Sequence, residues 1–253
     1  KESAAVLIAI DNESMAEFKQ GSSTNKKFIA KIIDKVAEYS PKVIVLSIML
    51  GNNGDNLVVA EAIKRAGNVI IAYSSNSGLD KVDRAVLAAS PRCGCADILP
   101  ISEDNIQRAF VTQQFDQKNM FGPCAVPLEA AIIYRDIPLK EITLKGQENS
   151  FIIMSKNEAI NIPVKEYGEA LINYLYTEKN MPTISTHRLL EENFDPAILK
   201  NNIAILCVTA DALGDSFDTL KTSMTGVFNA IGSQLAPLIS DLVGRITTIT
   251  GTI

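Results

Sequence analysis

The chain has 253 residues, of which 47% are apolar and 21% charged, and its formal net charge is −5. This length suffices for one large α/β domain or two small ones with a substantial core. The acidic balance, without any basic patch, excludes nucleic acid as an expected partner. No apolar stretch reaches the roughly 18 residues that cross a bilayer, and we expect the sequence to be a domain of a longer protein.

The first third of the chain alternates strands and helices. Continuous apolar runs predict three strands with both faces buried, at 5–10, 43–49 and 69–73. Residues 26–39 have the helical period, with Asn25 as the expected N-cap, and residues 56–66 form a second helix closed by Gly67. Strands of this kind, joined by helices of this length, indicate parallel pairing in a sheet covered on both faces.

The middle of the chain has a different pattern. A helix is predicted at 80–89, and an irregular stretch that contains RCGC (92–95) follows it and ends at Pro100. The pattern then predicts an edge strand at 107–115, a helix at 124–135 and three short strands at 151–154, 159–162 and 170–174. Turn signals separate the short strands, which is typical of an antiparallel insertion or meander.

The last third returns to the first pattern. MPTIS (181–185) is extended and leads into a short helix at 186–192, residues 203–208 form a buried strand, and residues 226–243 carry the apolar stripe of an amphipathic helix. Since there is no internal repeat and no Ser/Gly linker, we predict a single domain over residues 1–253. Its class is α/β, with a mostly parallel central sheet, helices on both faces and an antiparallel, strand-rich middle insertion.

The carboxyl ends of the predicted strands carry the candidate site residues. They are Asp11 after the first strand, Ser47 at the end of the second, and Thr209, Asp211, Gly214 and Asp215 in the loop after the last. Ligand sites of parallel sheets lie at this edge. If the strands are neighbours, Asp11, Asp211 and Asp215 face one crevice suited to a cation or an amine. The alternative is structural: Asp11 caps the turn after it, and Asp215 accepts hydrogen bonds from the amides of its own loop.

Catalytic patterns are sparse. His187, the single histidine, is expected at the surface in the first turn of a short helix, and no nucleophile elbow, dinucleotide-binding loop or Walker loop is present. A carboxylate-based or metal-dependent hydrolase using Asp11 and Asp215 is the alternative function. A zinc site from the cysteines at 93, 95 and 124 with His187 matches no common spacing, so we expect no metal and no cofactor.

Several segments occur in an order and with spacings that resemble the CHASE2 family of extracytoplasmic sensor domains, from about Val6 to Leu242. The segments are AIDNES, PKVIVLSIML, DNLVVAEAIKRAGNVIIAY, LINY with PTIS, KNNIAILCVTADALGDSFDTL and GVFNAIGSQLAPLI. Asp11 and Ser14 match the acidic and serine positions after the family's first strand. Ser47 stands where the family usually has an aspartate. Ser14 thereby joins the candidate ligand-binding residues.

The resemblance implies a role. Such domains lie outside the cytoplasmic membrane, between an N-terminal anchor and several membrane helices, and are joined to a cytoplasmic histidine kinase, adenylate or guanylate cyclase, or serine/threonine kinase. The domain itself is then a sensor and not a catalyst. Its expected partners are an unknown small molecule or ion, the flanking transmembrane helices and a second copy in a homodimer. The helix at 226–243 is the expected transmitter toward the membrane.

The four cysteines give two expectations. Cys207 lies inside the last apolar strand and is expected to be a small buried hydrophobe. If the domain is exported, Cys124 is expected to be oxidised with Cys93 or Cys95, because a bridge between the latter two across one glycine is strained.

Overall fold

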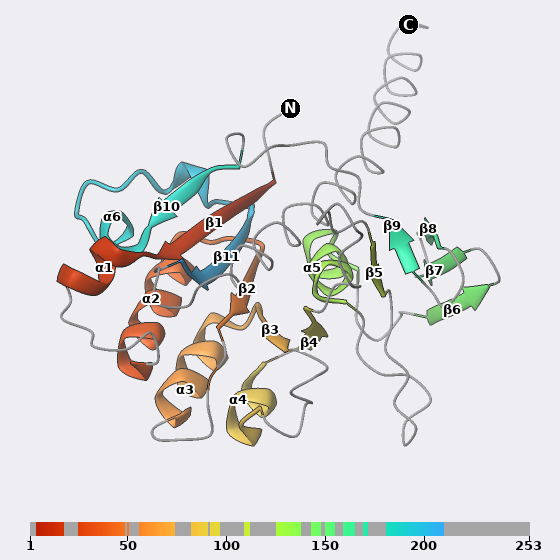
Figure 1. Cartoon of the computed structure of the whole chain (residues 1–253), viewed down its shortest axis with the longest axis horizontal. Helices are drawn as coiled ribbons and strands as arrows, with labels where there is room; N and C mark the ends of the chain where they lie inside the picture. Colours follow the sequence, from red (N-terminus) through yellow and green to blue (C-terminus); the bar gives the residue numbers. More distant parts are fainter. Residues whose placement is uncertain are drawn as a thin grey trace, which may run out of the picture.

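A parallel six-stranded sheet forms the centre of the molecule. The computed structural model describes residues 4–17, 25–48, 50, 56–73, 82–90, 92–96, 109–111, 125–137, 143–147, 150–154, 159–164, 169–171 and 181–209. The strands of this sheet are β1 (Ala5–Ile10), β2 (Val43–Ser47), β3 (Val69–Tyr73), β4 (Arg92–Cys95), β10 (Thr183–Ser185) and β11 (Ile203–Val208). They pair in parallel in the order β10-β1-β11-β2-β3-β4 (Figure 1). The strand that is last in the sequence therefore lies inside the sheet, between β1 and β2.

The inner strands are apolar on both faces, as the sequence predicts. Every residue of β1, β2 and β11 is buried, because helices cover both sides of a parallel sheet. The expectation of irregular structure at RCGC was wrong, since these residues form β4. Its backbone pairs with β3 from Ile70↔Arg92 to Tyr73↔Cys95. Strand propensity is weak in this segment, and pairing with a formed neighbour outweighs it.

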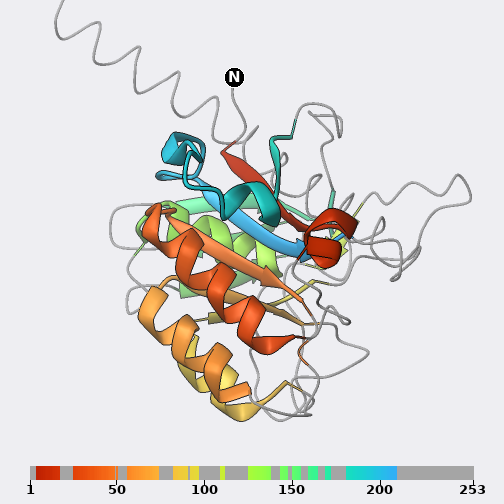
Figure 2. The same cartoon turned by 90° about the vertical axis from the view of Figure 1, so that its left-hand side faces the viewer.

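Four helices share one face of the sheet. They are α2 (Lys26–Glu38), α3 (Asn56–Ala66), α4 (Arg84–Ala89) and α6 (Thr186–Leu189). Figures 1 and 2 show α2, α3 and α4 side by side on this face. The chain steps from β1 to β2, β3 and β4 in one direction, so right-handed crossovers place the connecting helices on the same side. Val6, Ile8 and Leu206 belong to the core under these helices.

The ends of α2 and α3 follow from the predicted capping residues. The side chain of Asn25 accepts a hydrogen bond from the amide of Phe28 at 3.1 Å, which confirms it as the N-cap of α2. Gly67 follows α3 with a φ of 74°, the left-handed conformation that favours glycine. Within the residues that the structure describes, no helix combines the length and apolarity needed to cross a membrane.

The opposite face of the sheet carries α5 (Val126–Tyr134), close to the helix predicted at 124–135. The chain has reached the β4 edge by then, and Ala125 pairs in parallel with Cys95 before the helix begins. Val126 and Ala130 pack with Val45 and other side chains of this face. The prediction of helices on both faces is therefore confirmed.

The middle of the chain forms small antiparallel sheets, as predicted. Three strands, β6 (Thr143–Gln147), β7 (Ser150–Met154) and β8 (Ala159–Pro163), form a meander. Two more, β5 (Ala109–Val111) and β9 (Glu169–Leu171), pair with each other. A short helix after β1, α1 (Asn12–Glu17), was not predicted. The amphipathic helix expected at 226–243 lies outside the described residues.

Candidate functional site

The first and last strands of the described chain lie side by side within the sheet, so the residues that follow them come together where the parallel strands end. β1 and β11 pair along their whole length, from Ala5↔Ile203 to Ile10↔Val208. The amide of Thr209 then donates to the carbonyl of Ile10 at 2.9 Å, which extends the ladder by one residue. Asp11 and Thr209 therefore leave neighbouring strands at the same level. The condition for a shared site, that the first and last buried strands are neighbours, is therefore met.

Ser47 ends the strand on the other side of β11. It pairs with Cys207 of β11, and β11 separates it from the Asp11 position on β1. Ser47 is 8% exposed. Three of the candidate residues therefore stand at the carboxyl ends of three adjacent strands, where α/β sheets place their ligands.

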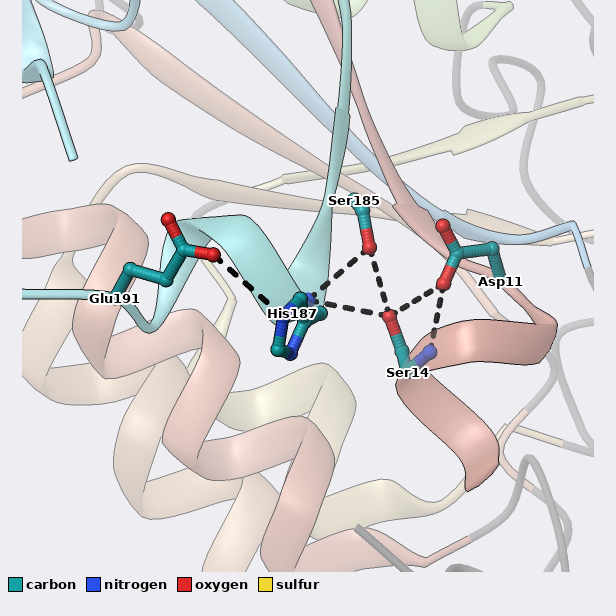
Figure 3. Close-up of polar contacts among 5 residues, drawn as sticks. All are labelled: Asp11, Ser14, Ser185, His187 and Glu191. Carbon is teal, nitrogen blue, oxygen red and sulfur yellow. Dashed lines mark hydrogen bonds and ion pairs between the residues drawn. The ribbon is translucent and has the colours of Figure 1, made fainter. Parts of the chain in front are cut away.

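Asp11 is the N-cap of α1. Its Oδ1 accepts hydrogen bonds from the amide of Ser14 at 2.8 Å and from the hydroxyl of Ser14 at 2.6 Å. This confirms the structural role expected for Asp11. Figure 3 shows Oδ1 directed at Ser14 and the second carboxylate oxygen directed away from it. Oδ1 thus holds the turn, and the Ser185 side chain adds a further hydrogen bond to the carboxylate.

The structure extends this capping contact to Ser185 and His187, which were not among the predicted ligand-binding residues. Ser185, at the end of β10, is the N-cap of α6, and its hydroxyl lies 3.1 Å from that of Ser14. The backbone amide of His187 donates to both hydroxyls at 3.2 Å (Figure 3). The His187 ring faces Glu191, with Nε2 3.5 Å from Oε1. Ser14, which is fully buried, therefore joins the caps of two helices that follow adjacent strands.

His187 was expected at the surface, and this expectation was wrong in part. It lies in the first turn of α6 as predicted, but its side chain is only 26% exposed. The reason is that α6 packs against α1 and β1, which adjoin it in space and not in sequence. The strand order alone brings these segments together, and a sequence pattern contains no signal for it.

The electrostatics of Asp11 favour its ionised form. Burial of the carboxyl raises its pKa. The hydrogen bonds from the hydroxyl and amide of Ser14, together with smaller ones from the Ser185 side chain and the backbone of Asp11, outweigh this, so the pKa of Asp11 lies below its usual value. A carboxylate with a lowered pKa stabilises the folded state above its unfolded pKa of about 4, and this contribution is lost as the pH falls through the folded pKa.

Replacing Ser14 with alanine is expected to lower the free energy of unfolding at pH 7 by about 2 kcal/mol, because a buried hydrogen bond to a charged group is lost. The loss is expected to be smaller at pH 3, where Asp11 is protonated in the unfolded chain and gains less from its partner. Urea unfolding at both pH values measures the difference.

Ser90→Ala is the matched control. The Ser90 hydroxyl lies within hydrogen-bond distance of two neutral carbonyls, that of Val69 at 2.7 Å and that of Arg92 at 2.5 Å. Its removal is expected to cost the same at both pH values. An equal cost of Ser14→Ala at pH 7 and pH 3 would contradict the assigned role of the Asp11 carboxylate.

The other candidate residues, Asp211, Gly214 and Asp215, lie outside the described residues, so the hydrolase alternative that needs them remains a prediction. Among the residues that the structure describes, no group of three or more His, Cys, Asp or Glu side chains is placed to hold a metal ion. The zinc alternative fails on topology. β4 with Cys93 and Cys95 lies at one edge of the sheet, and β10, which leads to His187, lies at the other.

The structure tests one of the two expectations for the cysteines. Cys207 is 2% exposed and lies in the core, as predicted. Cys93 carries a free thiol, and Cys124 lies outside the described residues, so the disulfide expected of an exported domain stays a prediction. Burial raises the pKa of the Cys93 thiol and the nearby Glu129 carboxylate adds to this, so the thiolate is disfavoured.

A parallel six-stranded sheet with helices on both faces defines an α/β domain. A family model described as the CHASE2 domain matches residues 1–240, and the chain belongs to this family. No curated protein and no solved structure matches the chain. CHASE2 domains are sensory and not catalytic parts of signalling receptors, and they typically lie outside the cytoplasm.

Proposed function

We propose that residues 1–253 form one extracytoplasmic domain that senses a small ligand for a transmembrane receptor. The output of this receptor is a cytoplasmic histidine kinase or an adenylate or guanylate cyclase. Membership of the CHASE2 family supports the sensory role. The domain binds the ligand and changes its conformation, and the flanking transmembrane helices of the parent protein transmit this change to the output domain.

The observation that carries the proposal is the place of β11 in the sheet. β11 lies between β1 and β2, with Thr209 beside Asp11. A ligand at this edge therefore contacts elements from both ends of the domain at once. Since both ends lead toward the membrane in a receptor of this class, a shift between β1 and β11 is passed on in either direction.

The mechanism is a shift between two arrangements of the domain. A ligand moves such an equilibrium only if it binds one arrangement more tightly than the other. Ser14 connects Asp11 to Ser185 and to the amide of His187 by hydrogen bonds. A displacement of Asp11 therefore also displaces the end of β10, the strand next to β1. The change then reaches the output as a new conformation or a new geometry of a homodimer.

The full-length receptor in intact cells tests both parts of the proposal. A cysteine introduced at Leu57, which is 68% exposed, is expected to react with a membrane-impermeant maleimide without permeabilisation. In the same receptor, Asp11→Asn is expected to change the kinase or cyclase output roughly fivefold, because the substitution shifts the equilibrium between the two arrangements.

Lys200→Ala is the control for the output, because Lys200 is exposed and precedes β11 at the opposite edge of the sheet. It is expected to leave the output unchanged. Labelling of the Leu57 position only after permeabilisation would place the domain in the cytoplasm. Equal outputs from wild type, Asp11→Asn and Lys200→Ala would show that the carboxyl ends of the strands are not the sensing site.

A further inference from the structure

Thr186, the first residue of α6, carries a buried hydroxyl without a partner among the described residues. The residue is completely buried, and its Oγ1 forms no hydrogen bond within the part of the chain that the structure describes. A hydroxyl that is removed from water without gaining a partner destabilises the state in which it is buried. The arrangement in which α6 packs against the sheet, which we call closed, is therefore weakened by one of its own residues.

The helix α6 buries little apolar surface in the closed arrangement. It has four residues, of which Thr186 and Leu189 are buried. It follows β10, a strand of three residues at the edge of the sheet, and the residues after it, 191–193, are exposed. Figures 1 and 2 show α6 beside α1 at this end of the sheet. Segments that bury few apolar side chains open with a small free energy.

The cap that α6 shares with α1 acts in the opposite direction. The amide of His187 donates to the hydroxyls of Ser14 and Ser185, each at 3.2 Å. Movement of α6 away from α1 breaks the contact with Ser14, whereas it exposes the Thr186 hydroxyl to water. The contact with Ser14 thus favours the closed arrangement, and the hydroxyl of the preceding residue favours an open one.

We propose that α6 is a flap that opens and closes at the carboxyl ends of β1 and β10, and that the Thr186 hydroxyl sets how often it opens. In the open arrangement, water completes the hydrogen bonds of Thr186, and Ser14 keeps its bonds to Asp11. The inference rests on the proposed sensory function in one respect: the flap is then the element whose two positions a bound ligand distinguishes. The opening itself does not depend on that function.

Thr186→Val tests the flap directly, because valine has the shape and a similar helix propensity of threonine but carries no hydroxyl. The variant is expected to slow hydrogen–deuterium exchange of the α6 amides by about tenfold, since the closed arrangement no longer buries an unpaired group. In the wild type, these amides are expected to exchange at least about tenfold faster than those of β11, because the flap opens without unfolding the sheet. Mass spectrometry on peptides of the full-length protein, corrected for intrinsic exchange rates, measures both.

Thr183→Val is the matched control. It makes the same chemical change on β10, but Thr183 is exposed and its hydroxyl donates to the carbonyl of Met181 at 3.3 Å. It is expected to leave the exchange of the α6 amides within about twofold of wild type. Ser14→Ala is expected to act in the direction opposite to Thr186→Val and to speed this exchange by about tenfold, because the flap loses its hydrogen bond to α1.

Two results would overturn the proposal. If the α6 amides of the wild type exchange at the rate of the β11 amides, α6 opens only with the whole sheet and is not a flap. If Thr186→Val leaves the exchange of α6 unchanged or speeds it, the hydroxyl is already hydrogen-bonded, for instance to a buried water molecule, and does not set the opening.

The failures of this proposal and of the proposed function are distinguishable. In the receptor, Thr186→Val and Asp11→Asn are expected to change the kinase or cyclase output in opposite directions, because the first favours the closed flap and the second weakens the cap that holds it. If exchange behaves as expected but neither variant changes the output, the flap stands and its link to sensing is wrong. If the output responds to Asp11→Asn but α6 exchanges at the rate of β11, the sensory function stands and the flap is wrong.

Discussion

Replacing Arg92 with methionine is expected to lower the free energy of unfolding by about 3–5 kcal/mol, because it removes the cation that pairs with a buried carboxylate. Arg92 on β4 pairs with Glu129 on α5, and the two side chains are 18% and 2% exposed. The pair joins the last strand of the parallel sheet to the helix on its second face. Urea unfolding of the two proteins measures the difference.

Two further variants test whether the loss of stability in Arg92→Met comes from the buried charge of Glu129. The double variant Arg92→Met/Glu129→Leu is expected to recover most of the lost stability, because no unpaired charge remains in the core. Arg65→Met, which breaks the exposed pair with Asp34, is expected to cost at most about 1 kcal/mol. A loss for Arg92→Met as small as that for Arg65→Met would show that the Glu129 site is hydrated and its charge not truly buried.

Leu206→Ala is expected to lower the free energy of unfolding by about 2–5 kcal/mol, through lost burial and the cavity left behind. Leu206 is fully buried in the middle of β11, opposite Ile8 on β1 and Leu46 on β2. Because β11 joins the first two strands, the loss is expected to affect the whole sheet. A single shifted transition in thermal and urea unfolding checks this.

Leu57→Ala provides the matched comparison. It removes the same atoms from a side chain that is 68% exposed on α3 and is expected to change the stability by less than about 0.5 kcal/mol. If Leu206→Ala costs no more than this, or melts β11 in a separate transition, then β11 is not an integral strand of the core.

The parts of the fold that depend on local pattern could be predicted from the sequence. Buried parallel strands such as β1 and β11 are continuous apolar runs, and the caps at Asn25 and Gly67 have local physical reasons. β4 could not be predicted, because its arginine, cysteines and glycine form a strand only through pairing with β3. The buried charge of Glu129 also escaped prediction, since its partner on β4 is remote in sequence.

Some residues of the candidate site could likewise be predicted from the sequence, and others could not. Asp11 and Ser47 were found because they end predicted strands, and the carboxyl edge of a parallel sheet is where ligands bind. Ser185 and the amide of His187 were not found, because their link to Ser14 depends on β10 lying beside β1. Strand order is decided by packing of the whole chain, and no local pattern encodes it.

The insertion of β11 between β1 and β2 has a consequence for folding during synthesis. Leu7 on β1 pairs with Thr183 on one side and Ile205 on the other, so both neighbours of the first strand are synthesised long after it. A nascent chain cannot complete its sheet until residue 208 is available, and such long-range contacts make folding slow. Until β11 is available, β1 and β2 have no strand between them, so the two halves of the sheet cannot join.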